Sequence, residues 1–101
     1  MARIMVLGSG GFGISLSVML HKYGHDVTMW SKFPQEIESI RKFGENKKLL
    51  PGVAIDASIN LTTDIAEAED AELVILAVPS FAVRETAKAV SSHLAPNAIV
   101  A

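Results

Sequence analysis

The chain has 101 residues, half of them hydrophobic, and a formal net charge of −2. This length suits one small α/β domain, or part of a larger protein, rather than a two-domain enzyme. The balanced charge, with no basic stripe, gives no reason to expect nucleic-acid binding. The sequence contains no cysteine, which excludes a disulfide framework and a zinc–thiolate site. No apolar run approaches the roughly 20 residues of a membrane helix, so we expect a soluble protein, and the low net charge and lack of cysteine favour a cytoplasmic one.

Predicted strands and helices alternate along the chain. Short apolar or β-branched runs predict strands at residues 3–7, 26–30, 59–63, 72–78 and 98–101. Helical spacing of apolar residues predicts helices at residues 12–23, at 34–43, at 65–70 after an Asp64 N-cap, and from Pro79 and Ser80 to His93. Residues 45–58 predict an irregular connection. The run at 72–78 is almost continuously apolar, which predicts a strand buried on both faces.

This alternation predicts an α/β fold of the Rossmann type, a parallel sheet with helices on both faces and strand order 3-2-1-4-5. We expect residues 1–101 to be a partial dinucleotide-binding domain that stops in its fifth strand. The exposed edge of that strand and the surplus of apolar residues predict a marginally stable or self-associating chain, with a homodimer as one form.

Glycines 8, 10 and 13 fit the pattern G-x-G-x-x-G between the first strand and the first helix. In this pattern Gly8 permits a tight turn, Gly10 lets a diphosphate approach the backbone, and Gly13 permits close packing of the helix. The amino end of the helix offers unpaired N–H groups to the phosphates. The pattern also occurs by chance as a flexible loop, but its strand–helix–strand context favours dinucleotide binding.

The residues after the second strand bear on which dinucleotide binds. An acid that holds the ribose 2′-hydroxyl of NAD is usual at this distance, but the sequence reads MWSKFPQ. Ser31 could donate a hydrogen bond to a 2′-phosphate and Lys32 could neutralise it. The sequence therefore predicts NADPH as the preferred cofactor over NADH, the alternative being a solvated lysine on a loop. Val78 and Pro79, at the carboxyl end of the fourth strand, are expected beside the ribose or nicotinamide.

Other polar residues give weaker signals. His21, His25 and His93 have no carboxylate at supporting spacing, so surface or capping roles are expected. The acidic residues at 67, 69, 70 and 72 predict a solvated helix face and turn rather than a metal site. Leu50, Pro51 and Gly52 either border the active cleft or form a plain turn.

Five segments resemble the N-terminal part of bacterial NAD(P)-dependent glycerol-3-phosphate dehydrogenase: VLGSGGFGISL, GHDVTMWSK, ENKKLLPGV, TTDIAEAEDAELVILAVPS and FAVRE. ENKKLLPG and AVPS are more specific than the glycines. The resemblance implies reduction of dihydroxyacetone phosphate to sn-glycerol 3-phosphate for phospholipid synthesis.

The resemblance also implies cofactor contacts. The set expected to bind the cofactor is Gly8, Ser9, Gly10, Gly11, Phe12, Gly13, Ser31, Lys32, Phe33, Val78 and Pro79. Gly11 stands where the family commonly has serine, which removes a hydroxyl contact, and Phe12 keeps the family's aromatic residue. Phe33 replaces an Arg or Asp and could stack on adenine. The family's substrate-binding and proton-donating lysines lie after the fifth strand and in a helical C-terminal domain, so we expect no catalytic residue here.

Two other functions remain open from the sequence. One is the cofactor domain of a related two-domain reductase, such as ketopantoate reductase or a 6-phosphogluconate-type dehydrogenase, against which ENKKLLPG argues. The other is a non-catalytic nucleotide-sensing module. That class favours an acid at the end of the second strand, which this sequence lacks.

Overall fold

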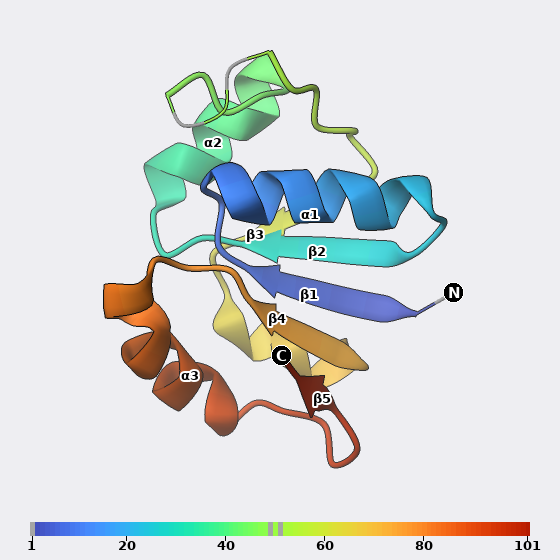
Figure 1. Cartoon of the computed structure of the whole chain (residues 1–101), viewed down its shortest axis with the longest axis vertical. Helices are drawn as coiled ribbons and strands as arrows, with labels where there is room; N and C mark the ends of the chain where they lie inside the picture. The colour runs from blue at the N-terminus through green and yellow to red at the C-terminus, as the bar shows by residue number, and fades with distance from the viewer. Residues whose placement is uncertain (1, 49, 51) are drawn as a thin grey trace.

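The computed structural model describes residues 2–48, 50 and 52–101, and its core is one parallel sheet (Figure 1). The sheet has the order β3-β2-β1-β4-β5, as the sequence predicts. The strands are β1 (Arg3–Leu7), β2 (Asp26–Trp30), β3 (Asn60–Thr62), β4 (Leu73–Leu76) and β5 (Ile99–Val100). Among the described residues, no helix is both long and apolar enough to cross a membrane.

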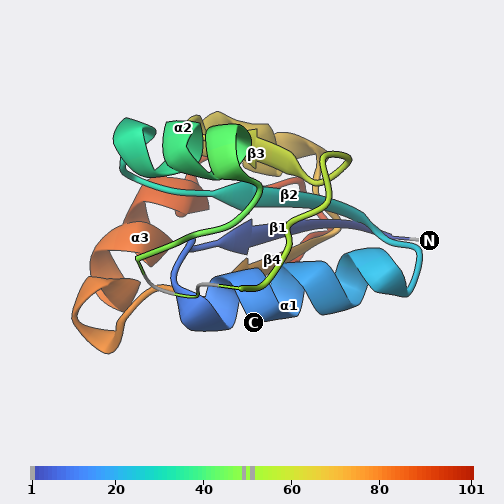
Figure 2. The ribbon, with the colours of Figure 1, turned by 90° about the horizontal axis from the view of Figure 1, so that it is seen from above.

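The two faces of the sheet bury separate apolar clusters, because side chains alternate along a strand. Ile4 and Val6 of β1 belong to one cluster and Met5 and Leu7 to the other. Ile14 of helix α1 (Gly11–Lys22) and Ile40 of helix α2 (Pro34–Phe43) complete the first cluster. Figure 2 shows α1 along the sheet. The second cluster is completed from the 3₁₀ helix η1 (Ile65–Asp70) and helix α3 (Val83–Ser91).

Most predicted boundaries hold to within one residue, and two elements need a larger correction. The Asp64 side chain accepts a hydrogen bond from Ala66 N, which confirms the predicted N-cap. The helix predicted from residue 80 is divided instead into the 3₁₀ turn η2 (Ser80–Ala82) and α3, and His93 lies beyond its end. No side chain caps η2, so its first turn lacks the hydroxyl cap that starts many helices.

The second correction concerns β4, which is shorter and less buried than predicted. It ends at Leu76, and Val74 alone of its four residues is fully buried. The Ala77 N–H donates to Leu7 O at 2.9 Å, which completes the pairing of Leu76 with Leu7, the last pair between β4 and β1. Its outer neighbour β5 has only two residues, which pair with Leu73 and Val74, and the Leu76 N–H donates to Ala101 O at 2.9 Å.

Two glycines let the loop after β1 lie against its neighbours without a gap. A Cβ on Gly8 would stand 2.5 Å from the Ala77 carbonyl oxygen, and the φ of Gly8 is +140°, a value that favours glycine. A Cβ on Gly13 would stand 2.4 Å from the carbonyl oxygen of Gly8. Close contact of α1, β1 and β4 therefore requires bare backbone at both positions.

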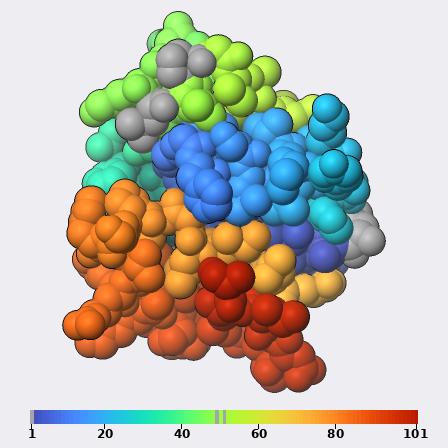
Figure 3. Space-filling model, in the orientation of Figure 1, coloured from blue at the N-terminus to red at the C-terminus, as the bar shows by residue number. Residues whose placement is uncertain are grey.

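The outer surface of α1 is apolar although it faces solvent. Phe12, Met19 and Tyr23 recur at helical spacing and are all exposed, and the outside of α1 lies open at the centre of Figure 3. Ile99 and Val100 of β5 are exposed as well. Large exposed apolar side chains that lie together can mark an interaction surface, so self-association of this chain remains a prediction.

Replacing Gly13 by alanine tests the close approach of α1. Alanine normally stabilises a helix interior over glycine by about 1 kcal/mol. At this position the added methyl group would overlap Gly8 O, so we expect Gly13→Ala to lower the free energy of unfolding by about 1–3 kcal/mol. Urea unfolding measures this change. Ser15→Ala, at an exposed position of the same helix, is the control and should change stability by less than about 0.5 kcal/mol. Equal stability of the two variants would contradict the close approach.

Candidate nucleotide site

The carboxyl ends of β1, β2 and β4 meet at one edge of the sheet, and the loops that follow them surround a cavity of about 240 Å³. Eight of the eleven residues expected to bind the cofactor line this cavity: Gly8, Ser9, Gly10, Ser31, Lys32, Phe33, Val78 and Pro79. In open α/β sheets, ligands bind outside this edge. The cavity therefore lies where the glycine pattern predicts a dinucleotide site.

The other three expected residues do not line the cavity. Gly11 begins α1, Phe12 is 68% exposed, and Gly13 is buried against Gly8. Leu50 packs against the first apolar cluster, and neither it nor Gly52 lines the cavity. Pro51 lies outside the described residues.

The amino end of α1 is open to an anion. Its N-cap, Gly10, makes no side-chain hydrogen bond, and the first turn contains no acidic residue. The first N–H groups of a helix have no partner within it, and they carry a partial positive charge. A diphosphate beside Gly8 and Gly10 would thus meet unpaired amide donors.

Ser9 is fixed by two residues that the sequence analysis missed. Its hydroxyl donates to Glu36 Oε1 at 2.6 Å, and its carbonyl accepts from Asn46 Nδ2 at 2.9 Å. Asn46 Nδ2 also donates to Glu36 Oε1 at 3.3 Å. Ser9 and Asn46 are both buried. The Ser9 hydroxyl proton is therefore used inside the protein, and any hydrogen bond that Ser9 donates to a ligand must come from its backbone N–H.

The residues after β2 form the side of the cavity where a ribose would lie. Ser31 is buried, and its hydroxyl accepts from Phe33 N at 3.1 Å, which leaves the hydroxyl proton for donation. The ammonium group of Lys32 lies 3.2 Å from the Glu85 carboxylate of α3. Phe33 and Phe81 are exposed aromatic rings beside the same cavity.

Sequence reasoning missed seven lining residues, Trp30, Glu36, Ala77, Phe81, Ala82, Glu85 and Thr86. Glu36 and Glu85 matter most, because they bring carboxylates to a site where the residues directly after β2 include none. Glu36 follows Ser31 by only five positions, so a search for acidic residues somewhat further beyond β2 would have found it. The sequence gives no such indication for Glu85, because it reaches the cavity from α3, 53 positions after Lys32.

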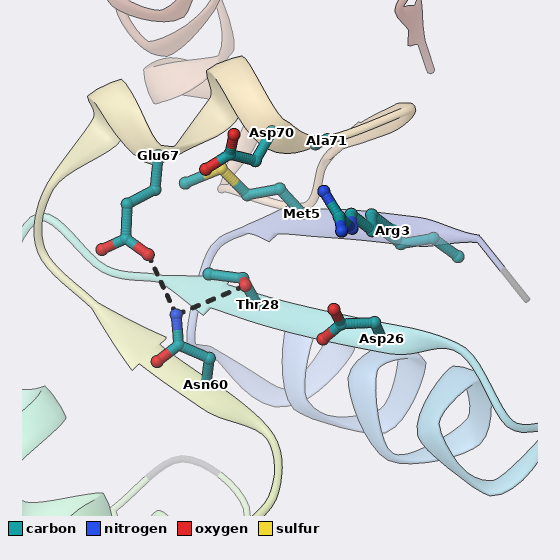
Figure 4. Close-up of a pocket in the computed structure, with 9 residues that line it drawn as sticks. Arg3, Met5, Asp26, Thr28, Asn60, Glu67, Asp70 and Ala71 are labelled. Atoms are coloured by element: carbon teal, nitrogen blue, oxygen red, sulfur yellow. Dashed lines mark hydrogen bonds between the residues drawn. The ribbon is translucent and has the colours of Figure 1, made fainter.

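A second hollow, of about 380 Å³, lies at the amino ends of β1 and β2 (Figure 4). Asn60 bridges it, donating to Glu67 Oε1 at 2.9 Å and to Thr28 Oγ1 at 3.4 Å. The Thr62 hydroxyl donates to the other oxygen of Glu67. These polar groups hydrogen-bond to one another and lie at the end of the sheet away from the glycine loop, so this hollow is not the candidate site.

His21 does have a carboxylate neighbour, contrary to the prediction from spacing. Its Nε2 lies 3.6 Å from Asp56 Oδ2 and 3.1 Å from Ser58 Oγ. Hydrogen bonds from the side chain and backbone of Ser58 hold the pKa of Asp56 below its usual value. A catalytic triad needs the carboxylate on the other ring nitrogen, so this cluster is a surface contact between α1 and the segment before β3.

In the described part of the chain, no group of three potential metal ligands gathers.

Replacing Asn46 tests how the glycine loop is held. Asn46→Ala would leave the Ser9 carbonyl and the Lys48 amide without their recorded partner. We expect it to lower the free energy of unfolding by about 1–3 kcal/mol, the cost of buried unpaired groups. The exposed Asn97→Ala is the matched control, with a change below about 0.5 kcal/mol in the same urea titration. If the two variants unfold alike, Asn46 does not hold the loop.

Comparisons with known proteins agree with this geometry. Residues 3–101 match the family model described as NAD-dependent glycerol-3-phosphate dehydrogenase N-terminus. Glycerol-3-phosphate dehydrogenase [NAD(P)+] of Fusobacterium nucleatum is 39% identical over 101 residues, which are 99% of this chain and 30% of that protein. This chain thus spans under a third of the length of that relative.

Solved structures show the same fold in proteins of different name. A crystal structure of glycerol-3-phosphate dehydrogenase from Coxiella burnetii has a TM-score of 0.89 at 24% identity, over 98% of this chain and 31% of that one. A ketopantoate reductase from Ralstonia eutropha has a TM-score of 0.78 at 24% identity, over 97% and 32%. The fold alone does not separate these enzymes, but the sequence match does: the chain belongs to the NAD-dependent glycerol-3-phosphate dehydrogenase family, to whose N-terminal part it corresponds.

Proposed function

We propose that this chain binds NADPH or NADH in the cavity at the carboxyl ends of β1, β2 and β4. The observation that carries the proposal is the uncapped amino end of α1 directly after Gly8 and Gly10, in a chain of this family. The diphosphate would lie against the backbone of this loop, and Ser31 and Lys32 would face the adenosine ribose. Phe33 or Phe81 would stack on adenine, as exposed aromatic rings beside a mostly apolar pocket can.

In the whole protein, the bound nicotinamide would transfer hydride to dihydroxyacetone phosphate and form sn-glycerol 3-phosphate for phospholipid synthesis. The names of the relatives and the match over residues 3–101 support this reaction. The chain itself would be the dinucleotide-binding domain, with the substrate-binding and proton-donating groups outside it. A cytoplasmic location and a homodimer belong to the same proposal, supported by the lack of cysteine and by the exposed β5.

Binding can be measured directly, because the single tryptophan, Trp30, lines the cavity and its fluorescence should respond to a nucleotide. We expect Gly10→Val to weaken NADPH and NADH alike by tenfold or more, about 1.4 kcal/mol, because its side chain would occupy the space of the diphosphate. Val53→Ala, outside the cavity, is a control that should retain binding. Unchanged affinity in a folded Gly10→Val protein would contradict the site.

The selectivity for NADPH should depend on Lys32. We expect Lys32→Ala to weaken NADPH by about fivefold while leaving NADH unchanged, since an exposed charge pair contributes up to about 1 kcal/mol. The effect should shrink as salt is added, because salt screens exposed charges. Lys22→Ala, at the far end of α1, removes the same charge away from the cavity. A wild-type protein that binds NADH more tightly, or a preference that survives Lys32→Ala, would contradict this assignment.

The proposed reaction would be assayed with the product of the intact gene. Incubation with dihydroxyacetone phosphate should oxidise NADPH and form sn-glycerol 3-phosphate, detectable by loss of NADPH absorbance and by product analysis. Oxidation with ketopantoate in place of dihydroxyacetone phosphate would instead identify a related reductase. Binding without oxidation of NADPH by any keto substrate would favour a nucleotide sensor.

A further inference from the structure

An ion pair joins the two sides of the candidate nucleotide cavity. Lys32 follows β2, and Glu85 lies in the first turn of α3. Lys32 Nζ and Glu85 Oε1 are 3.2 Å apart, and both residues line the cavity. The pair therefore spans the region between the end of β2 and α3, next to Ser31.

The pair changes what Lys32 can offer to a ligand. Among the described residues that line the cavity, Lys32 is the sole basic one, and Glu36 and Glu85 are the acidic ones. The Glu36 carboxylate accepts hydrogen bonds from Ser9 and Asn46. The Glu85 carboxylate has Lys32 as its recorded partner. The cation that a 2′-phosphate would need is thus already shared with a carboxylate.

The position of Glu85 in α3 suits a negative charge beside Lys32. Negative side chains are stabilised in the first turn of a helix, which is where Glu85 lies. A phosphate monoester carries a charge of about −1.5 to −2 near neutral pH, so it would have to displace this carboxylate or share Lys32 with it. A ribose hydroxyl has no charge and does not compete for Lys32.

We propose that Glu85 is a specificity-determining residue, which limits the preference for NADPH over NADH by holding the ammonium group of Lys32. The proposal rests on the proposed function, since it assumes that the ribose lies beside Ser31 and Lys32. Glu85 acts through Lys32, so it is a positioning residue rather than a catalytic one. The resulting site would accept both cofactors with a modest preference.

Dissociation constants of NADPH and NADH, measured by Trp30 fluorescence, test this for the wild-type chain, Glu85→Gln, Lys32→Ala and the double variant. We expect Glu85→Gln to raise the preference for NADPH by about two- to fivefold, the range of an exposed ion pair. In the Lys32→Ala background, Glu85→Gln should raise the preference for NADPH by less than about 1.5-fold, since there is then no ammonium group to release. Glu69→Gln, which removes the same charge from η1 outside the cavity, should leave the preference unchanged.

The outcomes separate this proposal from the proposed function. If both cofactors bind and Glu85→Gln does not alter their ratio, Glu85 does not set selectivity and the site itself stands. If Glu85→Gln raises the preference equally without Lys32, direct repulsion replaces the proposed mechanism. If neither cofactor binds to any folded variant, judged by circular dichroism, the site and the role of Glu85 are both wrong.

Discussion

The contact between the backbone of Gly8 and its neighbours determines the geometry of the whole carboxyl edge of the sheet. The Gly8 N–H donates to Trp30 O at 2.8 Å, and the carbonyl of Gly8 lies where a Cβ on Gly13 would stand. Ala77 crosses on the other side, within 2.5 Å of where a Cβ on Gly8 would be. The ends of β1, β2 and β4 and the start of α1 thus meet around one residue. Gly8 and Gly13 are therefore required for this packing, and the cavity beside the loop is a consequence of it.

A carboxylate beside an anion site looks unfavourable, but the surroundings of Glu36 offset its charge. Glu36 lies in the first turn of α2, where the helix dipole favours negative charge. Its Oε1 accepts from Ser9 Oγ and Asn46 Nδ2. In this position it ties the glycine loop to α2 and to the segment before β3. Glu36 therefore helps to fix the shape of the glycine loop, where it binds the Ser9 hydroxyl while Asn46 binds the Ser9 carbonyl.

The parts of the fold that were predictable are those set by local patterns. The bounds of β1 and the Asp64 N-cap follow from short stretches of sequence, and so does the strand order once the elements are known. The length of β4 was not predictable, because it depends on its pairing with β1, which ends at Leu7 and Leu76, and on the short β5. Asn46, Glu85 and Phe81 reach the site from separate elements, so only the folded chain brings them to the residues named by the glycine motif. The same reason hid Asp56 from the analysis of His21.

In the proposed site, the groups that would attract any dinucleotide differ from the groups that would distinguish NADPH from NADH. The amides at the start of α1 belong to the backbone and would attract a diphosphate common to both cofactors. In the proposed binding mode, the side chains of Lys32 and Glu85, which line the cavity, would lie beside the adenosine ribose, the part in which the two cofactors differ. Changes at these exposed side chains do not disturb the packing around Gly8, because neither contributes to the two buried clusters. Selectivity can therefore vary within this fold at little cost to stability, whereas the glycine loop cannot change without moving three strands.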